Sequence, residues 1–404
     1  IVFPFAGFAL YLVYGCNLYS ANIFGKKIGR DRKFGLMDDP RIKGADSPTD
    51  GNDVRFFSGF RESLPQIISD LDSARASIHL ELYRISGEKQ MQDVVDALCR
   101  KAAEGLDVRL LTGRGIIRSL SYMRKMNSSG VKITSFHRRF FSLVSTSFRL
   151  RNRRMMMIAD GSAAYAGEQT FVRIAGPAAS RLEARFLADW SFAKGIPAEK
   201  TETAGNRGST RVQIVSSGPD VSGSADPAVL EYVAMIKSAV SSVILSVPYL
   251  VPDENIYNFL KLAALSGKNV SVIVPEKEKY WYQRWNTVSA AGSLLESGIR
   301  VFFSGMKIEE SIMCVDESLF GTGLPSFNSR EMLQDFNTSV LVRSEPVSGE
   351  VRDYLNGLIS ESSEFTEKDY AGRGISARVK IAFSRLMMYF NRGGLWDWPK
   401  TSWR

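Results

Sequence analysis

The sequence predicts an α/β protein built from two similar halves. Apolar runs typical of buried strands alternate with amphipathic helical stretches, which indicates βαβ connections and mostly parallel strands. This pattern occurs twice, and Gly130 in the first copy corresponds to Gly298 in the second. A chain of 404 residues is long enough for two such domains. We expect the halves to pack face to face as a pseudo-dimer.

The amino-acid composition excludes several classes of protein and several kinds of site. With 44% hydrophobic and 24% charged residues, this is not a disordered protein. Its three cysteines have no CxxC spacing, which excludes a disulfide scaffold and a cysteine zinc site. The chain has two histidines, His79 and His137, so a mechanism that needs several imidazoles lacks the residues for it. We expect neither a metal nor a cofactor.

The first element expected is a transmembrane helix over residues 1–24. Residues 1–20 contain no charged residue and are long enough to span a bilayer, with a signal peptide or a buried core helix as alternatives. Lys26 and Lys27 begin a basic flank that we place at the membrane interface. The positive-inside rule then puts the body on the cytoplasmic side of the inner membrane. Residues 25–54 form the expected juxtamembrane linker, rich in Asp, Pro and Gly from Gly35 to Asp53.

The first half is expected over residues 55–208 and the second over residues 209–370. In each, a helix leads into a buried strand, and an amphipathic helix then ends at Gly105 or Gly267 before another buried strand. A third strand follows a further helix. The stretches that carry these strands are Ser73–Tyr83, Lys101–Gly113, Ser128–Phe136, Ser238–Leu250, Lys261–Pro275 and Glu296–Gly305.

The charge balance predicts an anionic partner. Lys and Arg number 52 against 43 Asp and Glu, a net charge of +9, which suits nucleic acid or an anionic membrane. Beside a transmembrane segment, anionic phospholipid is favoured over nucleic acid, and a solvated surface is the remaining alternative. The residues expected to bind lipid or phosphate are Arg138, Arg139, Arg149, Arg151, Arg154 and Arg330.

The last element expected is an amphipathic tail over residues 371–404. Val379 and Phe383 belong to an apolar stripe at helical spacing, and the tail holds seven basic residues and one acidic residue. This favours a helix lying in the membrane interface over one packed on the core or on a partner. The further membrane-interface residues expected here are Arg378, Lys380, Arg385, Trp396 and Trp398.

Five segments in fixed order carry a family resemblance. They are RNRRMMMIADGSAAYAG (Arg151–Gly167), IAGPAA (Ile174–Ala179), FLADWSFAKG (Phe186–Gly195), VQIVSSGPD (Val212–Asp220) and PYLVPDE (Pro248–Glu254). In this combination the chain resembles the bacterial cardiolipin synthases of the phospholipase D superfamily over nearly its whole length. The resemblance implies two pseudo-symmetric phospholipase D-type α/β/α halves and chemistry without a metal.

The resemblance also implies an HxKxxxxD motif in each half. One histidine attacks phosphorus, the other acts as general acid and then base, and the lysines neutralise phosphate oxygens. The motif aspartates are kept as Asp160 and Asp316, which we expect to accept hydrogen bonds from backbone N–H groups at turns. The remaining His and Lys positions hold Arg153 and Met155 in the first half, and Glu309 and Ser311 in the second.

Neighbouring positions depart from the family as well. Gly167–Thr170 replaces Gly-Gly-x-Asn, Gly323–Ser326 replaces Gly-Ser-x-Asn, and Asn337 stands where the family has a glutamate. A substrate-side loop is missing between Thr170 and Ile174.

Neither histidine is expected to replace the lost ones. We expect His79 within a buried strand and His137 at the surface. An arginine stays protonated, so Arg153 cannot act as a nucleophile, whereas Glu309 can in principle. We favour a salt bridge between Arg153 and Glu309 that closes the old site.

The sequence therefore predicts a membrane-anchored pseudoenzyme. It would bind anionic phospholipid, partner an active cardiolipin synthase paralogue, or associate with another copy of itself. One alternative is an active synthase that condenses two phosphatidylglycerols using a substitute nucleophile. The other is a membrane scaffold whose old cleft is closed.

Overall fold

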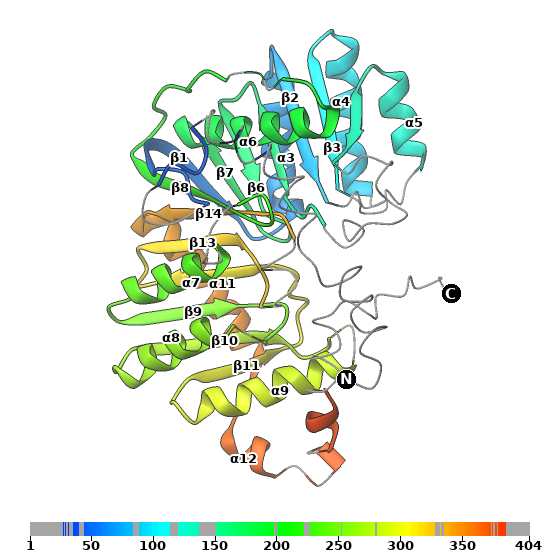
Figure 1. Cartoon of the computed structure of the whole chain (residues 1–404). Helices are drawn as coiled ribbons and strands as arrows, with labels where there is room; N and C mark the ends of the chain where they lie inside the picture. The colour runs from blue at the N-terminus through cyan, green and yellow to red at the C-terminus, as the bar shows by residue number, and fades with distance from the viewer. Residues whose placement is uncertain are drawn as a thin grey trace, which may run out of the picture.

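A single mixed sheet organises the protein, which is described here by a computed structural model. The described residues are 27, 29, 31, 35–39, 44–83, 89–113, 120–136, 151–197, 199, 201–221, 227–251, 253–278, 281–327, 332, 335–372, 374, 376–377 and 379–384. Within these residues the sheet has 15 strands, and helices cover both of its faces (Figure 1). The α/β class is thereby confirmed. The predicted transmembrane segment, residues 1–24, lies outside the described residues. Among the helices that are described, none has the length and apolar content to cross a membrane.

The strands occupy the following positions. In the first half they are β1 (Thr49–Phe57), β2 (Ser77–Leu82), β3 (Asp107–Thr112), β4 (Lys132–Ser135), β5 (Met156–Ala159), β6 (Ala163–Ala166) and β7 (Phe171–Ala175). In the second they are β8 (Thr210–Ser217), β9 (Ser242–Ser246), β10 (Asn269–Pro275), β11 (Arg300–Ser304), β12 (Ser311–Val315), β13 (Leu319–Leu324), β14 (Asn337–Arg343) and β15 (Ser362–Phe365). Each of the six predicted stretches contains a strand.

The helices alternate with these strands. Those of the first half are α3 (Phe60–Ser73), α4 (Lys89–Ala103), α5 (Leu120–Ser128) and α6 (Pro177–Lys194). Those of the second half are α7 (Pro227–Ser238), α8 (Glu254–Leu265), α9 (Trp281–Leu295), α11 (Glu345–Ser360) and α12 (Glu367–Ala371).

The two halves repeat one topology on either side of the β1–β8 pair. Outward from β1 the order is β7-β6-β5-β2-β3-β4, and outward from β8 it is β14-β13-β12-β9-β10-β11, followed by β15. The expected face-to-face packing is wrong, because β1 and β8 pair antiparallel and join the halves edge to edge. This pairing satisfies backbone groups that an open sheet edge would leave exposed.

Most strand pairs of the described sheet are antiparallel. The parallel pairs are β2–β3, β3–β4, β9–β10 and β10–β11, and the other labelled pairs run antiparallel. The expectation of mostly parallel strands is therefore wrong. It fails because β5–β6 and β12–β13 turn back after three residues, and such hairpins are necessarily antiparallel.

The helices form two layers. α6 and α11 lie on one face and share a hydrophobic core that spans both halves. On the opposite face, α3, α4 and α5 cover the first half and α7, α8 and α9 cover the second. Strand alternation divides these cores: Ile312 and Cys314 of β12 point to the α6–α11 side, and Met313 and Val315 to the other.

The chain ahead of β1 packs against the body. Leu36 and Ala45 are buried, and the Asp46 amide donates to the carbonyl of Ile214 at 2.8 Å. β1 begins at Thr49, inside the stretch expected to be a linker. This segment is therefore fixed to the first strand of the second half, β8.

Candidate functional site

A small pocket lies between the segments that lead into β5 and β12. Its volume is about 30 Å³, which is room for about two water molecules. All four lost His and Lys positions of the two motifs line it. The lining residues are Arg153, Met155, Gly167, Glu168, Glu309, Glu310, Ser311, Gly323, Leu324, Ser326, Asn337 and Thr338.

Backbone pairing across the two halves builds one wall of this pocket. The Arg153 amide donates to the Phe336 carbonyl at 2.9 Å, and the Phe336 amide donates to the Arg151 carbonyl at 2.8 Å. The residues before β5 therefore run beside the residues before β14. This pairing brings the first motif next to Asn337, the first residue of β14.

The charged side chains of the pocket take part in ion pairs. Arg153 Nη2 lies 3.7 Å from Glu168 Oε2, and its guanidinium stacks over the Tyr83 ring at 5.6 Å. Glu309 Oε1 lies 2.7 Å from Lys307 Nζ. Arg153 and Glu309 thus face the same pocket with these partners, and a direct salt bridge between them stays a prediction.

Asp160 and Asp316 hold equivalent turns in the two halves. Asp160 accepts hydrogen bonds from the amides of residues 75–77 at 2.8 to 2.9 Å. Asp316 accepts from the amides of residues 240–242. Both aspartates have a φ of 50°, in the left-handed region that Asp tolerates better than most residues. The expectation that these carboxylates stabilise turns is confirmed.

Glu310 lines the pocket from the second half. Its Oε2 accepts hydrogen bonds from the amides of residues 168–170, at 3.0 to 3.3 Å, and from Thr170 Oγ1. Its Oε1 accepts from Thr322 Oγ1 at 2.6 Å and from the Gly323 amide at 2.9 Å. A single buried carboxylate therefore joins the β6–β7 turn to β13.

The β6–β7 turn is shaped to meet this carboxylate. Gly167 has a φ of 127°, and an added Cβ would lie 2.0 Å from the Thr170 carbonyl oxygen. Gln169 Nε2 donates to the Lys307 carbonyl at 2.7 Å, and its Oε1 accepts from the Glu309 amide at 2.7 Å. The residues that replace the family motif thus hold the turn against the opposite half.

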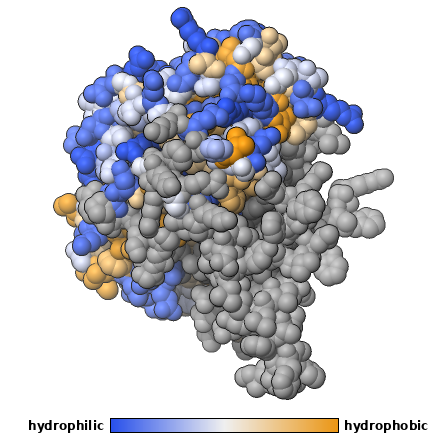
Figure 2. Space-filling model, turned by 45° about the horizontal axis from the view of Figure 1, so that its top comes forward, coloured by the Kyte–Doolittle hydropathy of each residue, from blue (hydrophilic) through white to orange (hydrophobic). Residues whose placement is uncertain are grey.

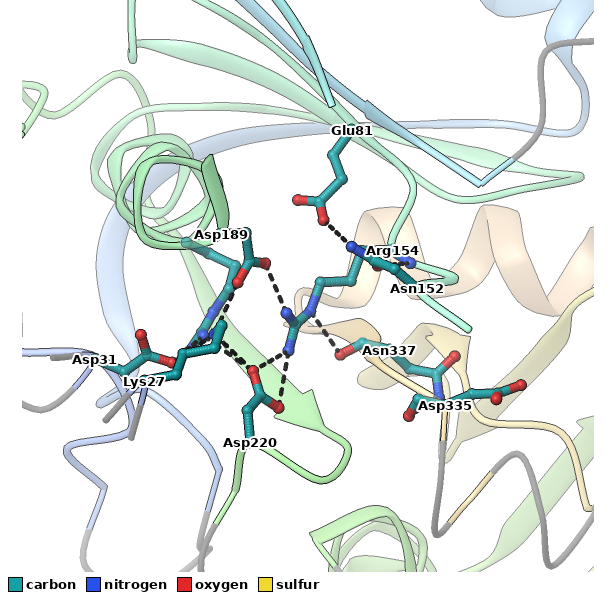
Figure 3. A network of polar contacts seen from close by, with 10 residues as sticks. Lys27, Asp31, Glu81, Asn152, Arg154, Asp189, Asp220, Asp335 and Asn337 are labelled. Carbon is teal, nitrogen blue, oxygen red and sulfur yellow. Dashed lines mark hydrogen bonds and ion pairs between the residues drawn. The ribbon is translucent and has the colours of Figure 1, made fainter. Parts of the chain in front are cut away.

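Arg154 belongs to a buried charge network (Figure 3). The arginine was expected to bind lipid or phosphate, but its side chain is fully buried and donates to Asp189 at 2.6 Å and Asp220 at 3.1 Å. Nε also donates to the Asn337 carbonyl at 3.4 Å. The expectation is wrong because the Arg154 guanidinium pairs with two carboxylates inside the protein instead of facing solvent. Without these partners, a buried arginine would be costly.

Lys27 completes the same network from the segment before β1. Its side chain is 1% exposed, and Nζ lies 2.7 to 2.8 Å from Asp31, Asp189 and Asp220. The expected place at the membrane interface is therefore wrong for Lys27. Arg185 of α6 donates to Asp31 at 2.7 Å. We call these three cations and three carboxylates, Lys27, Arg154, Arg185, Asp31, Asp189 and Asp220, the charge network.

The network favours the ionised forms of Arg154 and Asp220. Burial alone would lower the pKa of Arg154, but Asp189 and Asp220 raise it above its usual value. Burial alone would raise the pKa of Asp220, but Arg154 and Lys27 hold it well below the usual value. The three positive and three negative charges balance within the protein.

Arg154 and Glu310 occupy equivalent positions, each between the His and Lys positions of its motif. Arg154 reaches Asp220 and Asn337 in the second half, and Glu310 reaches residues 168–170 in the first. The two motifs thus contribute opposite buried charges that cross between the halves. Sequence reasoning missed Glu310, Asp189 and Asp220, although FLADWSFAKG and VQIVSSGPD contain the two aspartates.

The structure places some of the other predicted residues. Lys380 is exposed, and its Nζ lies 5.3 Å from the centre of the Trp285 ring. The Arg151 amide donates to Asp335 Oδ1 at 3.3 Å. Lys26, Arg138, Arg139, Arg149, Arg330, Arg378, Arg385, Trp396, Trp398 and His137 lie outside the described residues.

Glu81 gives the protein a testable dependence on pH. Burial raises the pKa of this carboxyl to about 8, with the charge of Asp189 acting in the same direction, against an ordinary value of 4.5. The folded state therefore binds the proton more tightly, and its stability falls as pH rises through the folded pKa. We expect the free energy of unfolding to decrease by ~2 kcal/mol between about pH 6 and about pH 8.

Urea unfolding at these two pH values measures the effect. Glu81→Gln can keep the hydrogen bond to Asn152 Nδ2 while removing the titration, so its unfolding should lose most of this pH dependence. A variant with an unchanged pH dependence would assign the effect to another group.

Known proteins match this chain in sequence. A family model described as cardiolipin synthase, PLD-like domain matches residues 232–359. The major cardiolipin synthase ClsA of Bacillus subtilis is 26% identical, over 95% of this chain and 90% of the relative. A cardiolipin synthase of Listeria monocytogenes is 27% identical, also over 95% of this chain and 90% of the relative.

Solved structures share the fold at low sequence identity. Phosphatidylserine synthase from Haemophilus influenzae superposes with a TM-score of 0.58 and 12% identity, over 84% of this chain and 93% of that one. Polyphosphate kinase from Porphyromonas gingivalis superposes with a TM-score of 0.52 and 13% identity, over 84% of this chain and 53% of that one. At these identities the similarity concerns the fold alone.

Proposed function

We propose that this chain, a cardiolipin synthase-like protein of the phospholipase D superfamily, is a pseudoenzyme that acts at an anionic phospholipid membrane. It does not transfer phosphatidyl groups. It serves as a non-catalytic partner of an active paralogue or of another copy of itself. Residues 1–24 anchor it, residues 55–208 and 209–370 are the two phospholipase D-type halves on the cytoplasmic side, and residues 371–404 are the membrane-facing tail.

The observation that carries this proposal is the pocket at the two motifs. The pocket is small, about 30 Å³, and none of the described residues that line it is a histidine. Phosphatidyl transfer through a phosphohistidine needs an imidazole within reach of phosphorus. The pocket supplies arginine, methionine, glutamate and serine at the four positions instead.

His79 is an unsuitable replacement. Its Nδ1 lies 2.6 Å from Glu183 Oε1, and its ring stacks on Phe186 with a centroid distance of 4.6 Å. The residue is 3% exposed, lies on β2, and is not one of the residues that line the pocket. These contacts support a structural role for His79.

A non-catalytic membrane scaffold is the second candidate. Glu310 binds the β6–β7 turn to β13 beside the motifs, which favours a protein whose surface, rather than its cleft, meets the membrane or a partner. The remaining alternative, an active synthase, depends on Glu309 as a nucleophile. Its carboxylate lies 2.7 Å from Lys307, which weakens that role because the cation stabilises the ground-state anion.

Reconstitution tests the proposal. The purified full chain is placed in phosphatidylglycerol liposomes, and cardiolipin and glycerol are followed by mass spectrometry beside an active synthase. We expect no cardiolipin above the protein-free blank. Cardiolipin formation by the native chain would overturn the proposal, and Glu309→Gln would then show whether Glu309 is the nucleophile.

A fourfold variant separates missing side chains from a closed pocket. It carries Arg153→His, Met155→Lys, Glu309→His and Ser311→Lys, which restores both motifs. We expect it to remain inactive, because the restored side chains face the same small pocket. Activity in this variant alone would show that the pocket opens readily and that side-chain chemistry was the sole loss.

A further inference from the structure

The chain that follows α12 forms a helix that packs on the second half with one side. Residues 376–377 and 379–384 are helical. Ala377 and Ser384 are buried, and Ile381 packs against the core beneath α7, α8 and α9. Lys380 reaches the Trp285 ring of α9. The helix is thus held by small and aliphatic residues that the predicted apolar stripe does not include.

The two residues of the predicted stripe that the structure describes point to solvent. Val379 is 62% exposed and Phe383 is 47% exposed. The Phe383 ring stacks on Trp281 of α9, with a centroid distance of 5.9 Å and an interplanar angle of 14°. Trp281 is also 53% exposed. We call Trp281, Val379 and Phe383 the aromatic patch.

The position of the aromatic patch relates it to the pocket. Trp281 begins α9, which the chain enters from the carboxyl end of β10, and Met306 is exposed just beyond the carboxyl end of β11. β10 and β11 are parallel neighbours, so both connections leave the same edge of the sheet. The chain from β11 continues directly into Glu309 and Glu310. In Figure 1 the helix that carries Phe383 is the red segment beside α12.

On the face seen in Figure 2, hydrophilic residues predominate among those described, and the apolar ones gather in a few places. Single exposed apolar residues need no partner, but stacked aromatic rings left half exposed indicate an interaction site. In sequence, residues 371–404 carry seven basic residues against one acidic residue, and Lys380 is exposed beside the aromatic patch. A positively charged apolar surface complements an anionic bilayer better than it complements another copy of this basic chain.

We propose that the aromatic patch docks on the surface of an anionic phospholipid bilayer. Trp281 and Phe383 enter the interfacial region, and Lys380 lies beside them toward the lipid phosphates. Docking would turn the edge that carries the pocket toward the membrane. This inference rests on the proposed action at a membrane and adds the surface that makes the contact.

Depth-dependent quenching tests the proposal on the full chain. Val379→Cys is labelled with bimane in a background with Cys16→Ser, since Cys99 and Cys314 are buried. The matched control is Leu262→Cys, because Leu262 is 59% exposed and lies near the end of α8. This helix leads into the amino end of β10, whereas Trp281 follows its carboxyl end. Both proteins are placed in phosphatidylglycerol vesicles with brominated acyl chains.

We expect quenching at position 379 to exceed that at position 262 several-fold. Trp281→Ser with Phe383→Ser should reduce the quenching at position 379, and phosphatidylcholine vesicles should give less of it. Equal quenching at both positions, or none at either, would overturn the proposal. Shielding of the label without lipid that grows with protein concentration would assign the patch to a second copy instead. Cardiolipin synthesis is measured in a separate experiment. If the chain proves to be an active synthase, the quenching still shows whether the aromatic patch contacts the bilayer.

Discussion

Replacing Asp220 with asparagine is expected to lower the free energy of unfolding by about 3–5 kcal/mol. Asp220 Oδ2 lies 2.7 Å from Lys27 Nζ, 3.1 Å from Arg154 and 3.8 Å from Arg185, and all of these side chains are almost completely buried. The variant leaves three cations facing two carboxylates. An uncompensated buried charge has no water to stabilise it, and this explains the size of the expected loss.

Urea unfolding followed by circular dichroism measures this loss. Asp353→Asn is the matched control, because its side chain is 72% exposed and its change should stay within about 0.5 kcal/mol. If Asp220→Asn does not fold, the double variant with Lys27→Met restores the balance of charge and should recover soluble, protease-resistant protein. An Asp220→Asn protein as stable as the control would show that the charge network contributes little.

Glu310→Gln is expected to lower the free energy of unfolding by about 2–3 kcal/mol. Six donors point to this carboxylate, and four of them are backbone amides. A glutamine keeps one oxygen but turns an NH₂ group toward donors, which leaves buried N–H groups without acceptors. The cost should appear both as lower stability and as a looser β6–β7 turn.

The neighbouring residue supplies the control for this experiment. Glu309→Gln removes a carboxylate of the same segment that is about one-third exposed and pairs with the exposed Lys307, so its effect should stay within about 0.5 kcal/mol. Hydrogen exchange should show faster exchange of the amides of residues 168–170 in Glu310→Gln alone. Identical behaviour of the two variants would refute the role assigned to Glu310.

The sequence was sufficient for the α/β class and for six of the strands, because both depend on local patterns. Period and composition locate β2, β3, β4 and their counterparts β9, β10 and β11. How the halves meet depends on β1, whose sequence Thr49–Phe57 contains Gly51, Asn52 and Asp53 and so resembles a linker. Its partners β7 and β8 are far away in sequence, and local pattern does not reveal them.

The candidate site divides in the same way. Motif spacing was sufficient to bring Arg153, Met155, Glu309 and Ser311 to one pocket. Burial of Lys27 and Arg154 was not predictable, because a basic residue is usually exposed. The acidic partners that they share, Asp189 of α6 and Asp220 just beyond β8, are far from both in sequence. The role of Glu310 was not predictable, because the family motif specifies only its neighbours, the positions of Glu309 and Ser311.

The β1–β8 pair has a consequence for cutting the chain. Cleavage between α6 and β8 would give two fragments, one ending its sheet at β1 and the other at β8. Each fragment would present an open strand edge whose natural complement is the other fragment. We therefore expect co-expressed fragments to assemble with each other, and either fragment alone to aggregate through this edge.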